Sequence, residues 1–387
     1  MPGSEVIGEE ERREVNDVFD HGGVLFRHGF DAQRNGCYKV REFEQAFANM
    51  MNVPHALAVT SGTAALRVAL AALDLRPGDE VVTQSFTFVA TVEAIIEARG
   101  TPVGAEVDKT LNLDPKDLER RITDRTRAVI VVHMLGTPAR LEEVQAICDR
   151  RGIALIEDTA WGCGGNLHGR ALGTWGKIGT FSFDFAKTIT TGEGGMVVFR
   201  DELMYKKASA WHDHGHENNP AFPRGEDTRS QSGFNFRMME LQGAIGLAQL
   251  RKLANIVKAQ RGNRDRLWNA IQHINGLTLR AVPEGAYDTA DALVTMLPDA
   301  ELAQQCRLKL RDIGIMTKIL PDATKWHFAE DWVHMPELEE SHGGNLSSAF
   351  PRTRALLRRA VSLPVTVTMP DGRPEAIRTV MEDVLGV

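Results

Sequence analysis

Cysteine is scarce in this sequence, and the few residues stand far apart. The chain has four cysteines among 387 residues, namely Cys37, Cys148, Cys163 and Cys306. No spacing among them fits a disulfide framework or a metal-binding motif, so we expect ordinary thiols in a reducing compartment. The opening residues are acidic where a secretory signal would be basic and then apolar, and no apolar run reaches bilayer length. These absences predict a cytoplasmic protein without a membrane span.

An excess of positive charge is also missing. The 45 Lys and Arg residues are outnumbered by 52 Asp and Glu residues, which gives a net charge of -7, and no basic run forms a local patch. This argues against nucleic acid as the main partner. The composition, 43% hydrophobic and 25% charged, is typical of a globular protein. A chain this long predicts a large domain and a smaller one, and we expect small-molecule chemistry.

What the sequence does contain is one lysine in an apolar setting between two expected strands. Lys187 follows an aromatic, alternating segment and precedes a Thr- and Gly-rich turn and a strand at Met196–Phe199. Its neighbours Phe185, Ala186 and Ile189 are apolar, and desolvation lowers the pKa of an amine. A neutral lysine suits Schiff-base chemistry with a carbonyl compound or with pyridoxal phosphate. The alternative is a surface lysine at a strand end.

Strand and helix patterns alternate through the first half of the chain. Expected strands are at residues 56–59, 80–83, 103–107, 128–133 and 153–158, and expected helices are at residues 64–73, 87–99, from 114, and 141–151. This order predicts a mostly parallel sheet with helices on both faces. Ligands of such sheets bind outside the carboxyl ends of the strands. The segments 60–63 and 84–88, with His133 and Asp158, fall at those ends.

Two of these positions suggest specific chemistry. Ser61, Gly62 and Thr63 precede a helix, where free N–H groups favour an anion such as phosphate; they are also an ordinary N-cap. Asp158 ends an apolar strand, where it is either a helix cap or a structural acceptor. Beside an active lysine, however, a buried carboxylate keeps a pyridine nitrogen protonated.

The two ends of the chain predict further parts. Residues 1–35 form a charged helix and a polar loop without a core of their own, so we expect them to lie across the protein or a partner subunit. A helix at 240–253 is followed by a second at about 254–274, and strands are expected at 293–297, 316–320 and 361–367 among helices. The predicted division is therefore an arm at 1–35, a large domain at 36–253 and a small domain at 254–387. No Cys or acid completes a familiar metal-ligand spacing with the three histidines within residues 212–216, so no metal is expected.

Several motifs resemble the DegT/DnrJ/EryC1/StrS group of pyridoxal-phosphate-dependent sugar aminotransferases. The resemblance runs from about Gly36 to Leu253. The motifs are Ser-Gly-Thr-Ala-Ala-Leu at 61–66, Phe-Thr-Phe-Val-Ala-Thr at 86–91, Ile-Glu-Asp at 156–158, Phe-Ser-Phe at 181–183, Lys187, Thr-Gly-Glu-Gly-Gly at 191–195 and Asn-Phe-Arg-Met at 235–238. The resemblance implies an α/β protein of pyridoxal-phosphate fold type I, like aspartate aminotransferase. Such a protein has a large, mostly parallel sheet domain and a smaller C-terminal α+β domain.

The same resemblance implies roles for individual residues. Lys187 would bind pyridoxal 5'-phosphate covalently and later move a proton, and Asp158 would bind the pyridine nitrogen. Further cofactor contacts are implied for Phe88 on the ring face, for Gly62, Thr63 and Ser182 at the phosphate, and for Asn235 from the neighbouring subunit. A site shared in this way implies an obligate homodimer.

Two positions distinguish this chain within the group. Trp161 stands where the group usually has Gln or His near the phenolic oxygen of the cofactor, and an indole donates a hydrogen bond but cannot accept one. Lysine at 187, where the dehydratase-like branch has histidine, resembles the aminating members. Arg237, two residues after Asn235, either binds a substrate carboxylate or pairs with a surface acid.

A narrower resemblance is to members that make the 8-amino form of 3,8-dideoxy-manno-octulosonate, an acidic lipopolysaccharide sugar. It is carried by the Met1-Pro-Gly opening, by residues 26–35 and by Asp-His-Gly-His at 213–216. It implies L-glutamate as amino donor and the 8-aldehyde of the octulosonate as acceptor. Candidate substrate contacts are Arg237, Arg27, His28, Arg34, His214 and His216. The alternatives are amination of a nucleotide-linked keto sugar or an aminocyclitol, a dehydratase, and a non-catalytic sensor.

Overall fold

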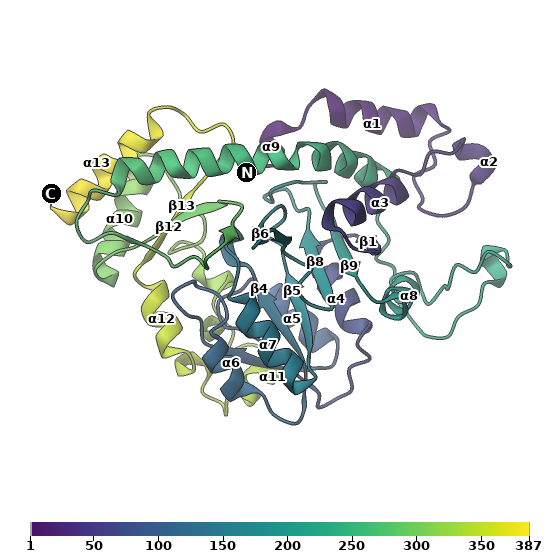
Figure 1. Ribbon diagram of the computed structural model, residues 1–387, viewed down its shortest axis with the longest axis horizontal. Coiled ribbons are helices and arrows are strands. Elements are labelled where there is room, and N and C mark those ends of the chain that lie inside the picture. The colour runs from purple at the N-terminus through teal and green to yellow at the C-terminus, as the bar shows by residue number, and fades with distance from the viewer. Residues whose placement is uncertain (1, 387) are drawn as a thin grey trace.

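The computed structural model describes residues 2–386, so Met1 of the opening motif lies outside the described residues. A large sheet domain and a smaller domain lie side by side beneath one long helix, α9, and the N-terminal helix α1 lies along the far end of α9 (Figure 1). No helix within residues 2–386 combines the length and the apolar character that crossing a bilayer requires.

The large domain is built on a seven-stranded sheet in the order β1-β9-β8-β5-β4-β2-β3. Neighbours from β8 to β3 are parallel, and β9 runs antiparallel to both β1 and β8. The strands are β1 (His55–Val59), β2 (Glu80–Gln84), β3 (Thr101–Ala105), β4 (Thr126–Val132), β5 (Ala154–Asp158), β8 (Ile178–Ser182) and β9 (Gly195–Phe199). The prediction of a mostly parallel sheet is confirmed. Its strands are buried almost throughout. β4 shows why, because the apolar run at residues 128–132 places apolar side chains on both faces of the sheet, and both faces must then be covered.

Helices cover both faces of this sheet. Successive strand residues point to opposite faces, so Ile130 packs with α4 and α5 while Val131 packs with α6 and α7. Near β1 and β9 the second face is covered by α3 and α9. The large-domain helices are α3 (Lys39–Met51), α4 (Gly62–Ala71), α5 (Ala90–Glu97), α6 (Pro115–Arg121), α7 (Leu141–Arg151) and α8 (Glu202–Trp211).

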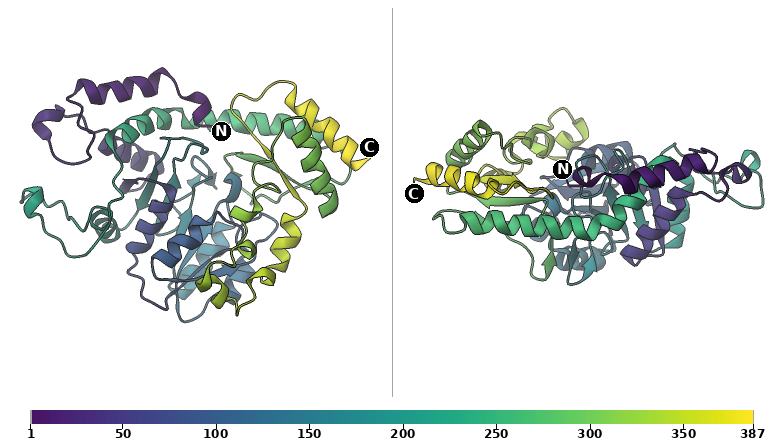
Figure 2. Two further views of the ribbon diagram at one scale, coloured as in Figure 1. Left: turned by 180° about the vertical axis from the view of Figure 1, so that it is seen from behind. Right: turned by 90° about the horizontal axis from the view of Figure 1, so that it is seen from above.

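The long helix α9 (Glu240–Ile271) is continuous, so the break expected after Leu253 is wrong. The residues around that point include no proline or glycine, and hence nothing that would end a helix. Its N-terminal part, as far as Val257, packs in the large domain, and its C-terminal part packs in the small domain through Leu267. The expected boundary at 253/254 therefore falls inside one rigid element. Helix α1 (Glu9–Asp20) packs along α9, as the views of Figure 2 also show.

The small domain is an antiparallel sheet in the order β10-β12-β13, with α10 and α13 packed against it. The expected strand at 316–320 is wrong, because the segment is irregular. Its backbone N–H groups bond instead to Ser362. The N–H of Lys318 donates to the carbonyl of Ser362, and the N–H of Leu320 donates to Oγ of Ser362. The elements are β10 (Thr278–Leu279), β12 (Ala292–Met296), α10 (Ala300–Asp312), β13 (Ala360–Pro364) and α13 (Arg373–Leu385).

Shorter elements complete the chain. A small sheet in the order β11-β6-β7 flanks the large domain. Residues 326–357 return from the small domain to the large domain, and Phe328 and Phe350 enter the core of the large domain. This return places Trp326 and His327 against residues 87–89, at the carboxyl end of β2. The short elements are α2 (Asp31–Arg34), β6 (Asn166–Leu167), β7 (Arg170–Ala171), β11 (Ala286–Tyr287), α11 (Pro336–Ser341) and α12 (Pro351–Leu357).

Candidate active site

A pocket of about 380 Å³ opens at the carboxyl ends of the central strands, where the sheet topology predicts a ligand site. Turns after β1, β2, β5 and β8 supply most of its wall, and His327 of the returning segment closes one side. The structure brings together here the predicted residues Gly62, Thr63, Phe88, Asp158, Trp161, Ser182 and Lys187. Five candidate substrate contacts (Arg27, His28, Arg34, His214 and His216) do not line this pocket, nor do Asn235 and Arg237.

The turn after β1 forms the anion-binding end of the pocket. Ser61 caps α4 by accepting a hydrogen bond on Oγ from the N–H of Ala64, at 3.0 Å. Gly62 packs so tightly against β8 that a Cβ atom at this position would lie 2.7 Å from Cβ of Ser182. Ser61, Gly62 and Thr63 line the pocket at the N-terminus of α4, which is the positive end of a helix and favours an anion. These residues fit the phosphate of pyridoxal phosphate.

Asp158 forms the acid end of the pocket. Its Oδ1 accepts from the N–H of Ala160 at 3.0 Å and its Oδ2 from Thr91 Oγ1 at 3.3 Å. Burial raises the pKa of this carboxyl, while the bond from Ala160 and the charge of Lys187 act against that rise. A cationic ring nitrogen beside the Asp158 carboxylate would stabilise its negative charge in place of the water that burial removes. The residues present thus fit a protonated pyridine.

Lys187 lies in the turn between β8 and β9, and its carbonyl accepts a hydrogen bond from the N–H of Gly3 at 3.1 Å. Burial lowers the pKa of its amine to about 8, although Asp291 and Asp158 favour the charged form. The direction and its cause, desolvation, are those predicted, but the surface that desolvates the amine differs. Phe185 is 52% exposed, so the desolvating surface is the pocket wall and not the neighbouring phenylalanine. The Nζ atom lies 3.3 Å from the centre of the Trp161 ring.

A second group of charged residues joins the N-terminal arm to the loop after α8. Asp213 is buried, with His28 Nε2 at 3.2 Å, Arg224 Nη2 at 2.6 Å and the guanidinium of Arg237 in contact. Although burial raises the pKa of Asp213, the hydrogen bonds from His28 and Arg224 hold it well below its ordinary value. Arg237 therefore pairs with a buried acid, and not with a surface acid as one alternative expected. Sequence reasoning missed Arg224, which no motif marks.

The other arm residues make contacts that brace the arm. Arg27 lies 2.7 Å from Glu44, and Arg34, almost fully buried, lies 3.0 Å from Glu240. In the loop, His214 is exposed, and His216 Nδ1 lies 3.3 Å from Asp227. Asn235 is also exposed and pairs through its backbone with Asp213.

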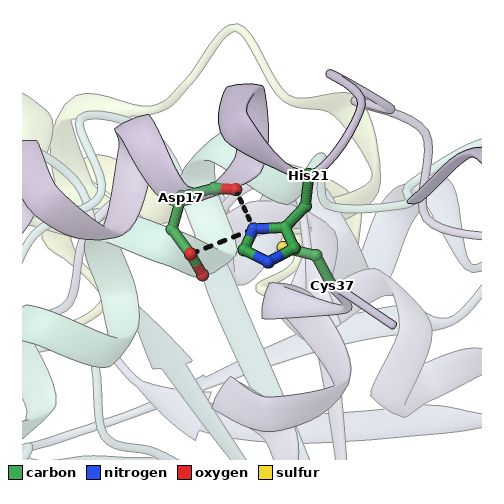
Figure 3. Close-up of side chains that lie close together, drawn as sticks. All are labelled: Asp17, His21 and Cys37. Carbon is green, nitrogen blue, oxygen red and sulfur yellow. Dashed lines mark hydrogen bonds and ion pairs between the residues drawn. The ribbon is translucent and has the colours of Figure 1, made fainter. Parts of the chain in front are cut away.

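One group of potential metal ligands occurs among residues 2–386, and it lies away from the loop histidines. The side chains of Asp17, His21 and Cys37 offer ligand atoms within 4.8 Å of one another (Figure 3). Lys39 Nζ, however, lies 2.6 Å from the Asp17 carboxylate, and His21 Nδ1 is bonded to the Asp17 carbonyl at 2.8 Å. The ammonium of Lys39 thus already neutralises the acid that an ion would need.

The chain is similar to known enzymes over nearly all of its length. The model of the DegT/DnrJ/EryC1/StrS aminotransferase family matches residues 7–385. A GDP-perosamine synthase of Vibrio cholerae is 37% identical over 65% of each chain, and the spore coat polysaccharide biosynthesis protein SpsC of Bacillus subtilis is 31% identical over 98% of this chain and 95% of its own. Among solved structures, an aminotransferase from Psychrobacter cryohalolentis superposes with a TM-score of 0.86, at 25% identity, over 98% of this chain and 97% of its own.

The fold agrees with these relatives. A large, mostly parallel sheet domain, a lysine after β8 and a small C-terminal domain make up the fold type I architecture that the motifs predicted. A protein with this fold, the putative sugar aminotransferase Spr1654 from Streptococcus pneumoniae, has been solved in a PLP form and in a PMP form. The chain belongs to the DegT/DnrJ/EryC1/StrS aminotransferase family and is a pyridoxal-phosphate-dependent aminotransferase.

Proposed function

We propose that the chain transfers the amino group of L-glutamate to the aldehyde carbon of 8-oxo-3,8-dideoxy-manno-octulosonate, which gives the 8-amino sugar of lipopolysaccharide. The observation that supports this choice is the excess of cations in the group that joins the arm to the loop after α8: the guanidinium groups of Arg224 and Arg237 share one carboxylate, Asp213. Donor and acceptor would both carry a carboxylate. In a ping-pong reaction the same site holds each in turn, so a surplus of positive charge suits both.

The residues of the pocket would divide the work of aminotransfer. When bound, pyridoxal phosphate supplies an electron sink for the carbon that gives up or receives the amino group. The amine of Lys187 would hold the cofactor and then move a proton at that carbon. Asp158 would keep the ring nitrogen protonated, Phe88 would cover the ring, and the turn at Gly62–Thr63 with Ser182 would hold the phosphate.

A homodimer would complete this site. Asn235 is exposed, and Phe234 beside it presents its ring to solvent, next to the turn that carries the phosphate contacts. The N–H of Thr60 donates to the carbonyl of Phe236, so the Asn235 segment runs along the rim of the pocket. We propose that Asn235 contacts the phosphate of the partner subunit. Arg237 would then bind a substrate carboxylate across the interface.

Among the other candidate contacts, the geometry favours His28 over Arg34. His28 belongs to the Asp213 group, whereas Arg34 is buried against Glu240 and the carbonyl of Cys37. We therefore assign Arg34, and Arg27 with its bond to Glu44, to bracing the arm, and we keep His28, His214 and His216 as candidates that a partner subunit would bring to the sugar.

A nucleotide-linked keto sugar is the second candidate acceptor. The 37% identity to a GDP-perosamine synthase favours it, because that enzyme's name specifies a nucleotide sugar. The two candidates differ in the group that the pocket must recognise, a carboxylate in one case and a diphosphate with a base in the other.

A two-step assay separates these candidates. Purified holoenzyme is mixed with glutamate or glutamine, and loss of the cofactor's absorbance reports the donor half-reaction. The aminated enzyme is then offered the acidic eight-carbon aldehyde or uridine- and guanosine-diphosphate keto sugars, and return of the absorbance is followed. We expect glutamate and the octulosonate to react fastest. Efficient return with a nucleotide sugar, and none with the octulosonate, would contradict the proposed acceptor and leave the family activity intact.

A further inference from the structure

Trp161 presents its ring face to the amine of Lys187. Lys187 Nζ lies 3.3 Å from the ring centre, which is direct van der Waals contact between an amine and a π face. The indole is 9% exposed. Its backbone is held in place, because the Trp161 carbonyl accepts a hydrogen bond from Thr289 Oγ1 at 3.0 Å. The ring is therefore a pocket wall with an anchored backbone, and it lies beside the Lys187 side chain.

A second lysine approaches the same ring from the small domain. Lys318 Nζ lies 5.3 Å from the ring centre and 2.7 Å from Asp291 Oδ1. Asp291 is 1% exposed, and among the described residues no group bonds to its other oxygen, Oδ2. Two cations and one incompletely paired carboxylate thus converge on a single indole.

We propose that Trp161 is a positioning residue whose ring face holds the amine of Lys187 whenever that amine is not bonded to the cofactor, with the Asp291–Lys318 pair fixing the charge around it. The inference rests on amino transfer through Lys187, and it is independent of which sugar accepts the amine. It also gives a physical reason for the departure at position 161. A Gln or His here offers a polar atom to the cofactor's oxygen, whereas an indole face offers a site for an ammonium.

The attraction between the Trp161 ring and the Lys187 amine depends on the charge of the amine. A desolvated ammonium is attracted to an indole face, and a neutral amine is attracted far less. The ring therefore retains Lys187 while it is charged and releases it on loss of the proton, which is when it acts as a nucleophile. The charged and titratable groups that face Lys187 are Asp158, Asp184, Asp291, Lys318 and His327. Asp291 opposes release and Lys318 promotes it.

The test measures Lys187 itself. Holoenzyme is converted by glutamate to its pyridoxamine form, in which this lysine is free, and is pulse-labelled with acetic anhydride from pH 6 to 10. Mass spectrometry of the peptide carrying Lys187 then gives the pKa and the intrinsic reactivity of the amine. The same labelling is repeated on the cofactor-free chain, so failure of the half-reaction leaves the measurement possible.

Removing the ring should lower the pKa of Lys187. We expect a fall of about one unit in Trp161→Leu and a smaller fall in Trp161→Phe, because phenylalanine keeps a weaker π face. The matched control is Trp175→Leu, which removes an indole that faces Arg170 at 4.7 Å outside the pocket and should leave Lys187 unchanged. An unchanged or raised pKa in Trp161→Leu would overturn the inference. Faster labelling of Lys187 without a shift of its pKa would also overturn it, since the ring would then only block access of the reagent.

Two further variants test the charged pair and do not alter the indole. Lys318→Met removes a like charge and leaves Asp291 to favour the ammonium, so the pKa of Lys187 should rise. Asp291→Asn removes the opposing acid, so the pKa should fall. If the pKa of Lys187 shifts in the same direction in both variants, or does not shift in either, the proposed placement of Lys318 and Asp291 around the amine is contradicted. This test holds even if Trp161→Leu fails to fold.

Discussion

Lys187 is the one amine among the described residues that line the pocket, and the chemistry proposed for the site depends on it. We predict that Lys187→Ala binds pyridoxal phosphate only non-covalently and loses several orders of magnitude in turnover, because both the covalent anchor and the proton carrier are removed. Borohydride reduction of the wild-type protein followed by peptide mapping should place the pyridoxyl group on Lys187. Reduced label on any other lysine would contradict the assignment of the site.

The depressed pKa of Lys187 predicts how covalent capture of the cofactor depends on pH. Only the neutral amine attacks a carbonyl carbon, and burial brings its pKa down to about 8 from an ordinary value near 10.5. The capture rate of the cofactor-free chain should therefore rise about tenfold per pH unit below pH 8 and level off above it. Stopped-flow absorbance measures this rate. A midpoint near pH 10 would show that the amine is solvated in solution.

Sequence reasoning reached some of these residues and not others, for physical reasons. Asp158 and the turn at residues 61–63 follow apolar strands, and the strand order alone brings them to one edge. Lys318 and Asp291 are separated from Lys187 by more than 100 residues and carry no local signal, so only the folded chain shows that they face it. The apolar residues next to Lys187 in sequence also misidentified the surface that desolvates its amine, because Phe185 is exposed to solvent.

Among the elements, the segment before α1 has a role that its sequence does not suggest. Gly3 donates its N–H to the carbonyl of Lys187, and a Cβ atom here would lie 2.9 Å from both Ile189 Cα and Thr190 N. At the other end of the same segment, Glu5 bonds to Thr368 of the small domain. The N-terminal segment therefore supports the lysine turn from behind and ties it to the second domain.

This packing predicts that Gly3→Ala disturbs the lysine turn. The new methyl group must displace backbone, at a cost of about 1–3 kcal/mol for overpacking. We expect a lower urea midpoint and slower capture of the cofactor. Gly8→Ala is the matched control, because no atom lies within 4 Å of a Cβ at Gly8, and it should leave the capture rate unchanged. If both variants capture the cofactor at the wild-type rate, the support assigned to Gly3 is wrong.

Element type was easier to predict than element limits. The alternation of apolar segments indicated the large sheet, since buried parallel strands need continuous apolar runs. The division of α9 was wrong because a change of packing partner at about residue 260 leaves no mark on helix propensity. The segment 316–320 has a strand-like composition, but its backbone bonds to the side chain of Ser362, a contact that composition cannot indicate.

At the scale of the whole molecule, the N-terminal arm and the loop after α8 project together from one end of the large domain (Figure 1). They are joined by Asp213, which pairs with His28 of the arm and with Arg224 of the loop. Phe30, Phe222 and Phe234 of these segments are exposed. This exposed apolar and charged projection supports the proposed two-fold dimer with shared sites.

The shared site can be tested by complementation. If Asn235 serves the partner's phosphate, a dimer of one Lys187→Ala chain and one Asn235→Ala chain has one site with both defects and one with neither. Random reassociation of equal amounts makes half of the dimers mixed, and each mixed dimer has one intact site of two. We therefore expect about a quarter of the wild-type activity from two nearly inactive parents. Native mass spectrometry verifies that mixed dimers form. Mixed dimers without recovered activity would place Asn235 in its own chain's site, and a fully active monomer by sedimentation would remove the need for a partner.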